Sequence, residues 1–483
     1  MMVRARRWFS CSLALLFTLG LSPLVQAQSK ETLQPMELKI TPARPTPPIL
    51  KNRLLPLESK LNPGNAVPIY LRLEHEREKP LAKQFERKPD ELRGQNGAKF
   101  DIKATREFVN QYEGVYKHLH IAANRQKCEW DYPVKESGTN IFAILLPDAQ
   151  SMRQYIRFIA LKAHLEIAEG KFDDALETLQ TGFAVSKHIG SGPFLINSLV
   201  GVACASAMRD ELETFCGTEK APNIYWALTS LPRPFISLRS AFELEYIGAL
   251  TAFPEIDLDG KTLTAEEWKL KWNSLKMRWN TNWKEFALTG DDAKNDNAFV
   301  EALKLISVDE RGSPVAKAWH KERKGLSDAE IEKLPKEQLL LQYTAGYFCE
   351  MRDEAFRYMY LTSQEAKNVK RSTTDIIKEA RSKEIIPIGS LLLPAIERTI
   401  TATERFDRKV AALRIVEAIR CHAAENNNEL PASLDKISCL PVPTDPVTGQ
   451  AFSYEMKDGI ATLKAEDPVN VRNGIHYRIS IRK

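Results

Sequence analysis

The sequence predicts a mainly α-helical protein, an irregular array of antiparallel helix pairs that ends in a small C-terminal β-hairpin module. Two observations carry this prediction. Apolar residues recur three and four positions apart through most of the chain, which is the spacing of a buried helix face. Near the C-terminus they alternate with polar residues around an Asp-Gly dipeptide, which is typical of a β-hairpin. At 483 residues, 43% of them hydrophobic, the chain is long enough for two or three domains.

Residues 1–27 have the pattern of a secretory signal peptide. The basic start MMVRARR precedes an apolar run, and the segment ends in a small residue, Ala27. An uncleaved membrane anchor is the alternative, but the run is short for a span. Without the leader's arginines the net charge of +5 becomes +2, which argues against a nucleic-acid partner. We expect an exported protein (periplasmic, cell-surface or secreted) with no stable membrane span after cleavage.

Residues 28–68 contain eight prolines, including the stretch TPARPTPP at 41–48. Because proline lacks a backbone N–H and fixes φ, we predict a Pro-rich, extended and largely disordered linker here. We expect an α-helical array over residues 69–392, followed by a long helix and the small β module over residues 393–483.

The clearest helix pair lies at residues 148–184. Its first helix is predicted over 148–168, and Gly170 can adopt the left-handed conformation that ends a helix. Acidic residues at 173 and 174 favour the start of the second helix. Four residues have the spacing of a tetratricopeptide repeat, and the stretch resembles one such repeat: Ala163, Gly170, Phe172 and Ala175. The resemblance implies stacked neighbours, because one pair cannot bury its own apolar face.

Further helical stretches are predicted at 193–208, 264–287, 335–362 and 393–427. In the tail, FSYEM and IATLK flank the turn Asp458-Gly459, and HYRISI can add a third strand. The long helix, LPASL, DPVTG and the sheet together resemble the C-terminal pattern of secretion pseudopilins.

The mature chain also resembles uncharacterised exported proteins of planctomycete bacteria. The segments that carry this resemblance include CEWDYPVKESG, LLPDAQSMRQ, GKFDDALETLQTGFA and YWALTSLPRPFISLR, together with the tail. It implies an exported location and no particular mechanism.

Six cysteines remain outside the leader. Cys421 and Cys439 flank a turn-rich loop that can bring them together, so they are the favoured disulfide pair in an oxidising compartment. For the other four we favour buried free thiols.

The stretch EIDLDGKTLTAEE at 255–267 partly matches the calcium loop of an EF-hand. The candidate ligands, which surround Gly260, are Glu255, Asp257, Asp259 and Glu266. Two features depart from the pattern: Thr262 occupies a position that is normally apolar, and the first ligand is Glu. A helix cap explains the same residues, with Thr264 and Glu267 forming a capping box. We favour the cap and expect no metal here.

The helix predicted after this stretch carries four tryptophans on one face: Trp268, Trp272, Trp279 and Trp283. An exposed stripe of this kind is a ligand platform for sugar rings or for a partner helix. A buried stripe is simply the core face of the helix, and we favour burial because large exposed apolar patches are rare.

The sequence contains no phosphate loop, dinucleotide fingerprint, nucleophile elbow or HExxH motif, so we expect no cofactor. The leading hypothesis is a non-enzymatic exported scaffold or binding protein that holds a protein or peptide partner on its helical surface. The alternative is an extracytoplasmic hydrolase or glycan-active enzyme with its site in the helical groove, which the tryptophan stripe would support.

Overall fold

The computed structural model describes residues 33–48, 50–75, 85–94, 100–143, 147–258, 262–279, 308–361, 365, 373–466 and 474–482. The chain divides into two compact units. The first unit contains Met1–Ala27, Asp131–Leu146 and Ala241–Arg398, and the second contains Gln28–Trp130, Pro147–Ser240 and Thr399–Lys483. The predicted signal peptide, residues 1–27, lies outside the described residues.

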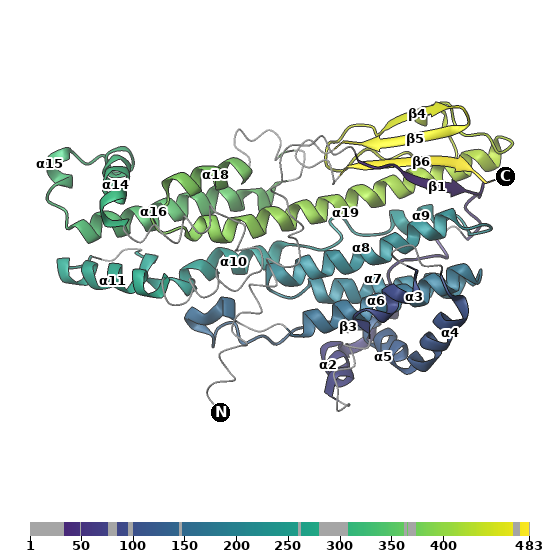
Figure 1. Ribbon diagram of the computed structural model, residues 1–483, viewed down its shortest axis with the longest axis horizontal. Coiled ribbons are helices and arrows are strands. Elements are labelled where there is room, and N and C mark those ends of the chain that lie inside the picture. The colour runs from purple at the N-terminus through teal and green to yellow at the C-terminus, as the bar shows by residue number, and fades with distance from the viewer. Residues whose placement is uncertain are drawn as a thin grey trace. The chain divides into compact units, whose positions relative to one another are not determined.

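The centre of the second unit is a layer of three helices, α6 (Pro147–Ala168), α7 (Phe172–Gly190) and α8 (Leu195–Gly217), each packed on the other two (Figure 1). The predicted helix pair is α6 and α7, and Gly170 between them has φ +72°, in the left-handed region. The third helix is longer than its predicted range of 193–208. Its apolar residues are buried in contacts with both α6 and α7. The pair α6–α7 therefore covers its apolar face with a third helix, as expected for a helix pair that cannot bury that face by itself.

Shorter elements surround this layer: β2 (Asn62–Asn65), α2 (Val67–His75), α3 (Lys88–Leu92), α4 (Ile102–Gln111), α5 (Glu113–Ala123), β3 (Arg125–Lys127) and α9 (Tyr225–Thr229). Helices α3 and α4 contact α6, while α5 contacts α7 and α2 contacts α5. Strands β2 and β3 pair in parallel.

The C-terminal sheet belongs to the second unit. It contains β4 (Ser453–Lys457), β5 (Ile460–Ala465) and β6 (Ile475–Ile481), with β1 (Met36–Ile40) along its edge in the order β1-β6-β5-β4 (Figure 1). The predicted hairpin and third strand are confirmed, and all three strands pair antiparallel. Asp458 (φ 52°) and Gly459 (φ 75°) both have the positive φ of the favoured tight hairpin turn.

Strand β1 departs from the expectation that residues 28–68 form a linker. It pairs in parallel with β6, placing Met36 opposite Tyr477, and it buries Leu38 and Ile40. Its sequence, MELKI, alternates with the period of a strand. This alternation is only five residues long and stands among prolines, and the partner strand lies more than 430 positions later in the sequence.

In the first unit, α16 (Lys336–Phe356) is the central helix, and α11 (Ala265–Arg278), α14 (Val308–Lys324) and α18 (Thr373–Lys383) pack against it. The other elements of this unit are η5 (Gly138–Ala143), α10 (Arg239–Ala252), η6 (Pro254–Ile256), α15 (Asp328–Ile331), η9 (Arg357–Tyr360) and the first turns of α19 (Ile388–Glu425). The long helix α19 continues into the second unit, where η10 (Leu434–Lys436) follows it.

Helix α19 begins earlier than the predicted residue 393. The buried carboxylate of Glu384 accepts backbone hydrogen bonds from Gly389 (2.6 Å) and Ser390 (2.9 Å) and so satisfies N–H groups of the first turn. Burial raises the pKa of Glu384 to about 7. Within the described parts of the chain, no helix is long and apolar enough to cross a lipid bilayer.

Candidate functional site

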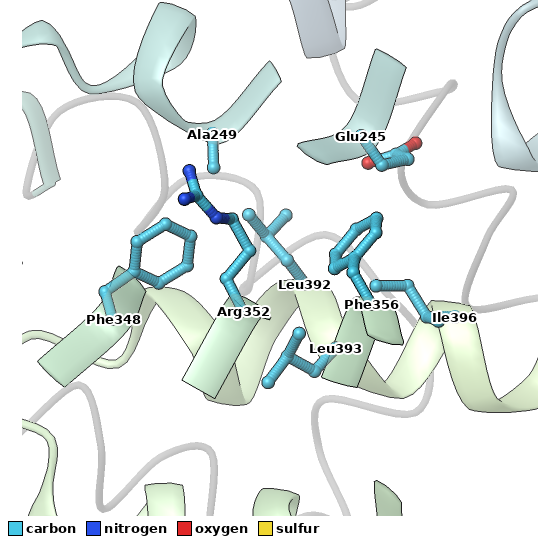
Figure 2. A pocket seen from close by; sticks show the side chains of 8 residues that line it. All are labelled: Glu245, Ala249, Phe348, Arg352, Phe356, Leu392, Leu393 and Ile396. Carbon is cyan, nitrogen blue, oxygen red and sulfur yellow. The ribbon is translucent and has the colours of Figure 1, made fainter. Parts of the chain in front are cut away.

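A hollow in the first unit is the strongest candidate for a binding site (Figure 2). Three helices contribute to it: α10, α16 and the first turns of α19. We call it the α10–α16–α19 hollow, and its lining residues are Glu245, Ala249, Phe348, Arg352, Phe356, Leu392, Leu393 and Ile396.

The spacing of the lining residues explains why each helix contributes a row of side chains. On α16 the row is Phe348, Arg352 and Phe356, four residues apart, which places them on one face of the helix. Leu392 and Ile396 on α19 have the same spacing. The walls are therefore mostly apolar, with one cation, Arg352, and one carboxylate, Glu245, among them.

That cation is the guanidinium of Arg352, whose side chain is only 8% exposed. Figure 2 shows it extending from α16 toward Ala249 of α10. Its Nε and Nη2 donate to Asp353 Oδ1 at 2.9 and 2.8 Å, and Nη2 also donates to the Tyr246 hydroxyl at 2.9 Å. The guanidinium carbon lies 3.8 Å from the centre of the Tyr246 ring, a cation–π contact.

The remaining nitrogen of this guanidinium, Nη1, makes a longer and weaker hydrogen bond than the other two. Among the described residues, Arg352 Nη1 makes one long contact, 3.5 Å to the backbone oxygen of Tyr246. Tyr246 itself packs edge-on against Phe356, with ring centres 5.5 Å apart. The guanidinium is thus held in one orientation with donor capacity to spare, which suits recognition of a carboxylate.

The hollow is small. Its closed part measures about 10 Å³, room for about one water molecule, and the roughly 230 Å³ of the whole depression includes open solvent. A side chain of a partner would therefore lie over the hollow rather than inside it. A substrate surrounded by catalytic groups needs more space than this.

The structure does not bring the three described calcium candidates, Glu255, Asp257 and Glu266, together as a metal site. Glu255 is buried, and its carboxylate accepts from Arg278 Nη2 at 2.9 Å and from the Ser274 hydroxyl at 2.7 Å. Burial raises the pKa of this carboxyl, but the hydrogen bonds from Arg278 and Ser274 outweigh it and hold the pKa below its usual value. Asp259 and Gly260 lie outside the described residues.

The favoured interpretation of this stretch, a helix cap, is confirmed. The Thr264 hydroxyl accepts from the backbone N–H of Glu267 at 3.3 Å, and the Glu267 carboxylate accepts from the Thr264 N–H at 2.7 Å. The remaining calcium candidates are Asp257, which precedes this cap, and Glu266, which is exposed in the first turn of α11. Nowhere in the described ranges do three His, Cys, Asp or Glu side chains group as metal ligands.

Three of the four tryptophans are core residues of the first unit. Trp268, Trp272 and Trp279 are 3%, 1% and 4% exposed. They have no face open for a sugar ring, which agrees with the favoured interpretation of the stripe. Trp283 lies outside the described residues.

The structure brings Cys421 and Cys439 together. Cys421 lies in the last turns of α19 and Cys439 follows η10, where the Cys439 thiol donates to the backbone oxygen of Ala418, three residues before Cys421, at 3.9 Å. Both are free thiols here, so the disulfide stays a prediction. Of the others, Cys204 and Cys216 are fully buried, as expected of inert thiols, whereas Cys128 and Cys349 are half-buried.

Sequence reasoning did not find the α10–α16–α19 hollow. One signal was present: Arg352 interrupts an apolar helix face between Phe348 and Phe356, and a charge on such a face is either paired or functional. Its neighbours from α10 and α19 become visible only in three dimensions. No protein-family model, curated protein or solved structure matches this chain.

Proposed function

We propose that this chain is an exported binding protein that holds a protein or peptide partner at the α10–α16–α19 hollow. The observation that carries the proposal is the combination of a shallow, mostly apolar depression with a preoriented guanidinium in its wall. A peptide that presents a large apolar residue next to an acidic residue fits both features.

The energetics favour such a partner. A leucine- or phenylalanine-sized side chain that covers the depression loses only part of its exposed area and gains about 1 kcal/mol. A carboxylate that reaches Arg352 Nη1 gains a charge-assisted hydrogen bond in a place where water is largely excluded. Because Asp353 and Tyr246 already hold the guanidinium in place, little side-chain entropy is lost on binding.

Binding is favoured over the glycan-active enzyme for two reasons. The tryptophan stripe that supported a sugar platform is buried at three of its four positions. The hollow is also smaller than a typical substrate site.

Two further parts of the proposal rest on sequence patterns. The signal-peptide pattern of residues 1–27 supports export. Helices α6 and α7 follow one another with only a short turn between them, in which Gly170 has a left-handed conformation. This arrangement supports a helix pair of the tetratricopeptide kind, in an array that is otherwise irregular.

The test is a selection of peptides from a random phage-displayed library on the full chain. We expect the enriched peptides to share a large apolar residue within about three positions of Asp or Glu, because the apolar rim of the hollow lies beside one cation. A fluorescent copy of an enriched peptide is then titrated against two variants by anisotropy.

The first variant is Leu392→Arg, which fills the hollow from its half-buried rim and places a second cation there. The matched control is Leu270→Arg on α11 of the same unit, because Leu270 is itself 66% exposed and lies outside the hollow. We expect at least a tenfold weaker Kd for the first variant, about 1.4 kcal/mol, and no change for the control. Equal affinity for both variants, or no shared peptide pattern, contradicts the proposal.

A further inference from the structure

Helix α19 carries three buried arginines in the second unit: Arg408, Arg414 and Arg420. Arg408 Nε lies 3.1 Å from Asp445 Oδ1, and Arg420 Nη1 lies 2.7 Å from a carboxylate oxygen of its own helix. Arg414 differs from both, because within the described part of the chain no carboxylate forms an ion pair with it. A buried cation without an anion is unusual, since nothing then compensates for its lost hydration.

The partners of Arg414 are neutral groups of helix α9. Its Nε donates to Thr229 Oγ1 at 2.9 Å, and its Nη2 donates to the Tyr225 hydroxyl at 3.0 Å. The two hydroxyls donate their own protons to the backbone oxygens of Tyr225 and Pro441, so each offers Arg414 only a lone pair. Among the described residues no acceptor binds Nη1. The guanidinium is therefore oriented, but its charge is not balanced.

A second cation, Arg233, lies close to Arg414. The segment that follows α9 contacts α19 at two points. Thr229 accepts from Arg414 at the first, and the ring centres of Phe235 and Phe406 lie 4.9 Å apart at the second. Arg233 lies between these points in the chain. Partial burial lowers the pKa of Arg233, and the charge of Arg414 lowers it further. Because Arg233 is otherwise exposed, a ligand from solvent can reach the pair.

One carboxylate, that of Asp407, influences this pair without closing an ion pair to either arginine among the described residues. Asp407 precedes Arg414 by seven residues on α19, which places it about 10 Å away along the same side of the helix. Burial raises the pKa of Asp407 to about 7, although the Phe235 backbone and the charge of Arg233 act in the opposite direction. At neutral pH this carboxyl is only partly charged, so it does not balance two guanidiniums.

We propose that the second unit binds a phosphate group between Arg233 and Arg414. Two guanidiniums match the charge of a phosphate group, about −1.5 to −2 at neutral pH, and their planar donors suit its oxygens. A single carboxylate ligand would balance only one of the two cations. The phosphate is either free or part of a larger molecule, because the same oxygens are recognised in both. The inference is independent of the proposed peptide binding, which concerns the first unit.

The experiment is isothermal titration calorimetry of the full chain with inorganic phosphate, at pH 7 and constant ionic strength. We expect one saturable site with a Kd of about 1 mM or tighter. Arg233→Gln changes an exposed side chain and should weaken binding at least about tenfold. The matched control is Arg44→Gln, whose side chain is 60% exposed in the same unit, and its affinity should equal that of the parent.

The same titration with glycerol 3-phosphate identifies the source of the phosphate group. Tighter binding of the ester than of inorganic phosphate indicates that the site recognises a phosphorylated molecule. Weaker binding of the ester indicates free phosphate.

Two further variants test the arrangement of charges. Asp407→Asn keeps the shape of the side chain and removes the carboxylate that competes for Arg233, so it should tighten phosphate binding at least about threefold. Arg414→Lys keeps the charge but loses the planar fork and should weaken binding by a similar factor. Absence of saturable binding up to about 10 mM phosphate, or parental affinity in Arg233→Gln, overturns the site. Unchanged or weaker binding by Asp407→Asn contradicts the position of the phosphate beside this carboxyl.

Discussion

His188 lies in the last turn of α7, and its environment disfavours the charged imidazolium. Its Nδ1 is hydrogen-bonded to the Tyr70 hydroxyl at 2.8 Å, and its backbone oxygen accepts from Trp130 Nε1 at 2.8 Å. Burial, assisted by the nearby positive charge of Lys187, lowers the pKa of His188 to about 4. A histidine of this kind links folding to pH.

We predict that His188 destabilises the second unit as the pH falls from about 6.5 to 4. In that window the unfolded chain binds a proton that the folded chain excludes, so the free energy of unfolding falls by at most about 3 kcal/mol. His188→Gln should remove this contribution, which is measured by thermal melts between pH 4 and 7.

The matched control is His118→Gln, because His118 Nδ1 bonds only the Gly114 carbonyl oxygen of its own helix among the described residues. Subtracting the variant curve from the parent curve isolates His188 from groups that act in the opposite direction. Asp407 is one of these: burial raises its pKa to about 7, so it lowers stability as the pH rises. A parent and His188→Gln pair with identical pH dependence refutes the assignment.

At the scale of elements, helices α7 and α8 approach so closely that only glycine fits at their crossing. A Cβ added at Gly201 would lie 2.7 Å from the Gly190 Cα and 2.9 Å from the Ser186 backbone oxygen. Both are backbone atoms, which cannot move aside without separating the helices.

We predict that Gly201→Ala destabilises the second unit by about 1–3 kcal/mol, the usual cost of overpacking, and at the upper end of this range because the contacts are with backbone. The control is Gly114→Ala on α5, where no atom lies within 4 Å of the added Cβ. There alanine should be neutral or stabilise the helix by up to about 1 kcal/mol. Urea unfolding of the two variants distinguishes them, and equal stabilities would show that the helices separate at little cost.

Elements differed in how far they could be predicted, and the reason is physical. The capping box at Thr264, the turn at Asp458-Gly459 and the end of α6 at Gly170 are local, because their hydrogen bonds or backbone angles involve neighbouring residues. Strand β1 was not predicted because a five-residue strand is stable only when it pairs with another strand, and its partner, β6, is distant in sequence. The α10–α16–α19 hollow was missed for the same reason, since each helix supplies only part of it.

At the scale of the whole molecule, residues 33–48 are built into the second unit near the C-terminal part of α19. Arg420 and Glu417 form an ion pair at 2.7 Å in which both side chains are 0% exposed. Arg420 also donates to backbone oxygens of Thr41 at 2.9 Å and Ala221 at 2.6 Å. One buried guanidinium therefore joins three segments that are distant in sequence.

We predict that Arg420→Met costs about 3–5 kcal/mol of unfolding free energy, because it leaves the Glu417 charge buried without its cation. It should also expose residues 41–48 to limited proteolysis. Urea unfolding and protease digestion followed by mass spectrometry are the measurements.

Arg44→Met is the matched control. Arg44 pairs with Glu425 of the same helix, but the two side chains are 60% and 39% exposed, so the loss should stay below about 1 kcal/mol. Equal losses for the two variants would mean that burial of the Arg420 pair has little effect on stability.

The sequence by itself determined the mainly helical class, the helix pair around Gly170, the cap of α11 and the C-terminal hairpin, because each depends on periodicity or on contacts within a few residues. The tertiary structure decided the rest: that β1 completes the sheet, that three tryptophans are core, that Arg352 stands in an apolar hollow, and that Cys421 meets Cys439. These features depend on which distant segments pack together, and that choice minimises the free energy of the whole chain rather than of any local stretch.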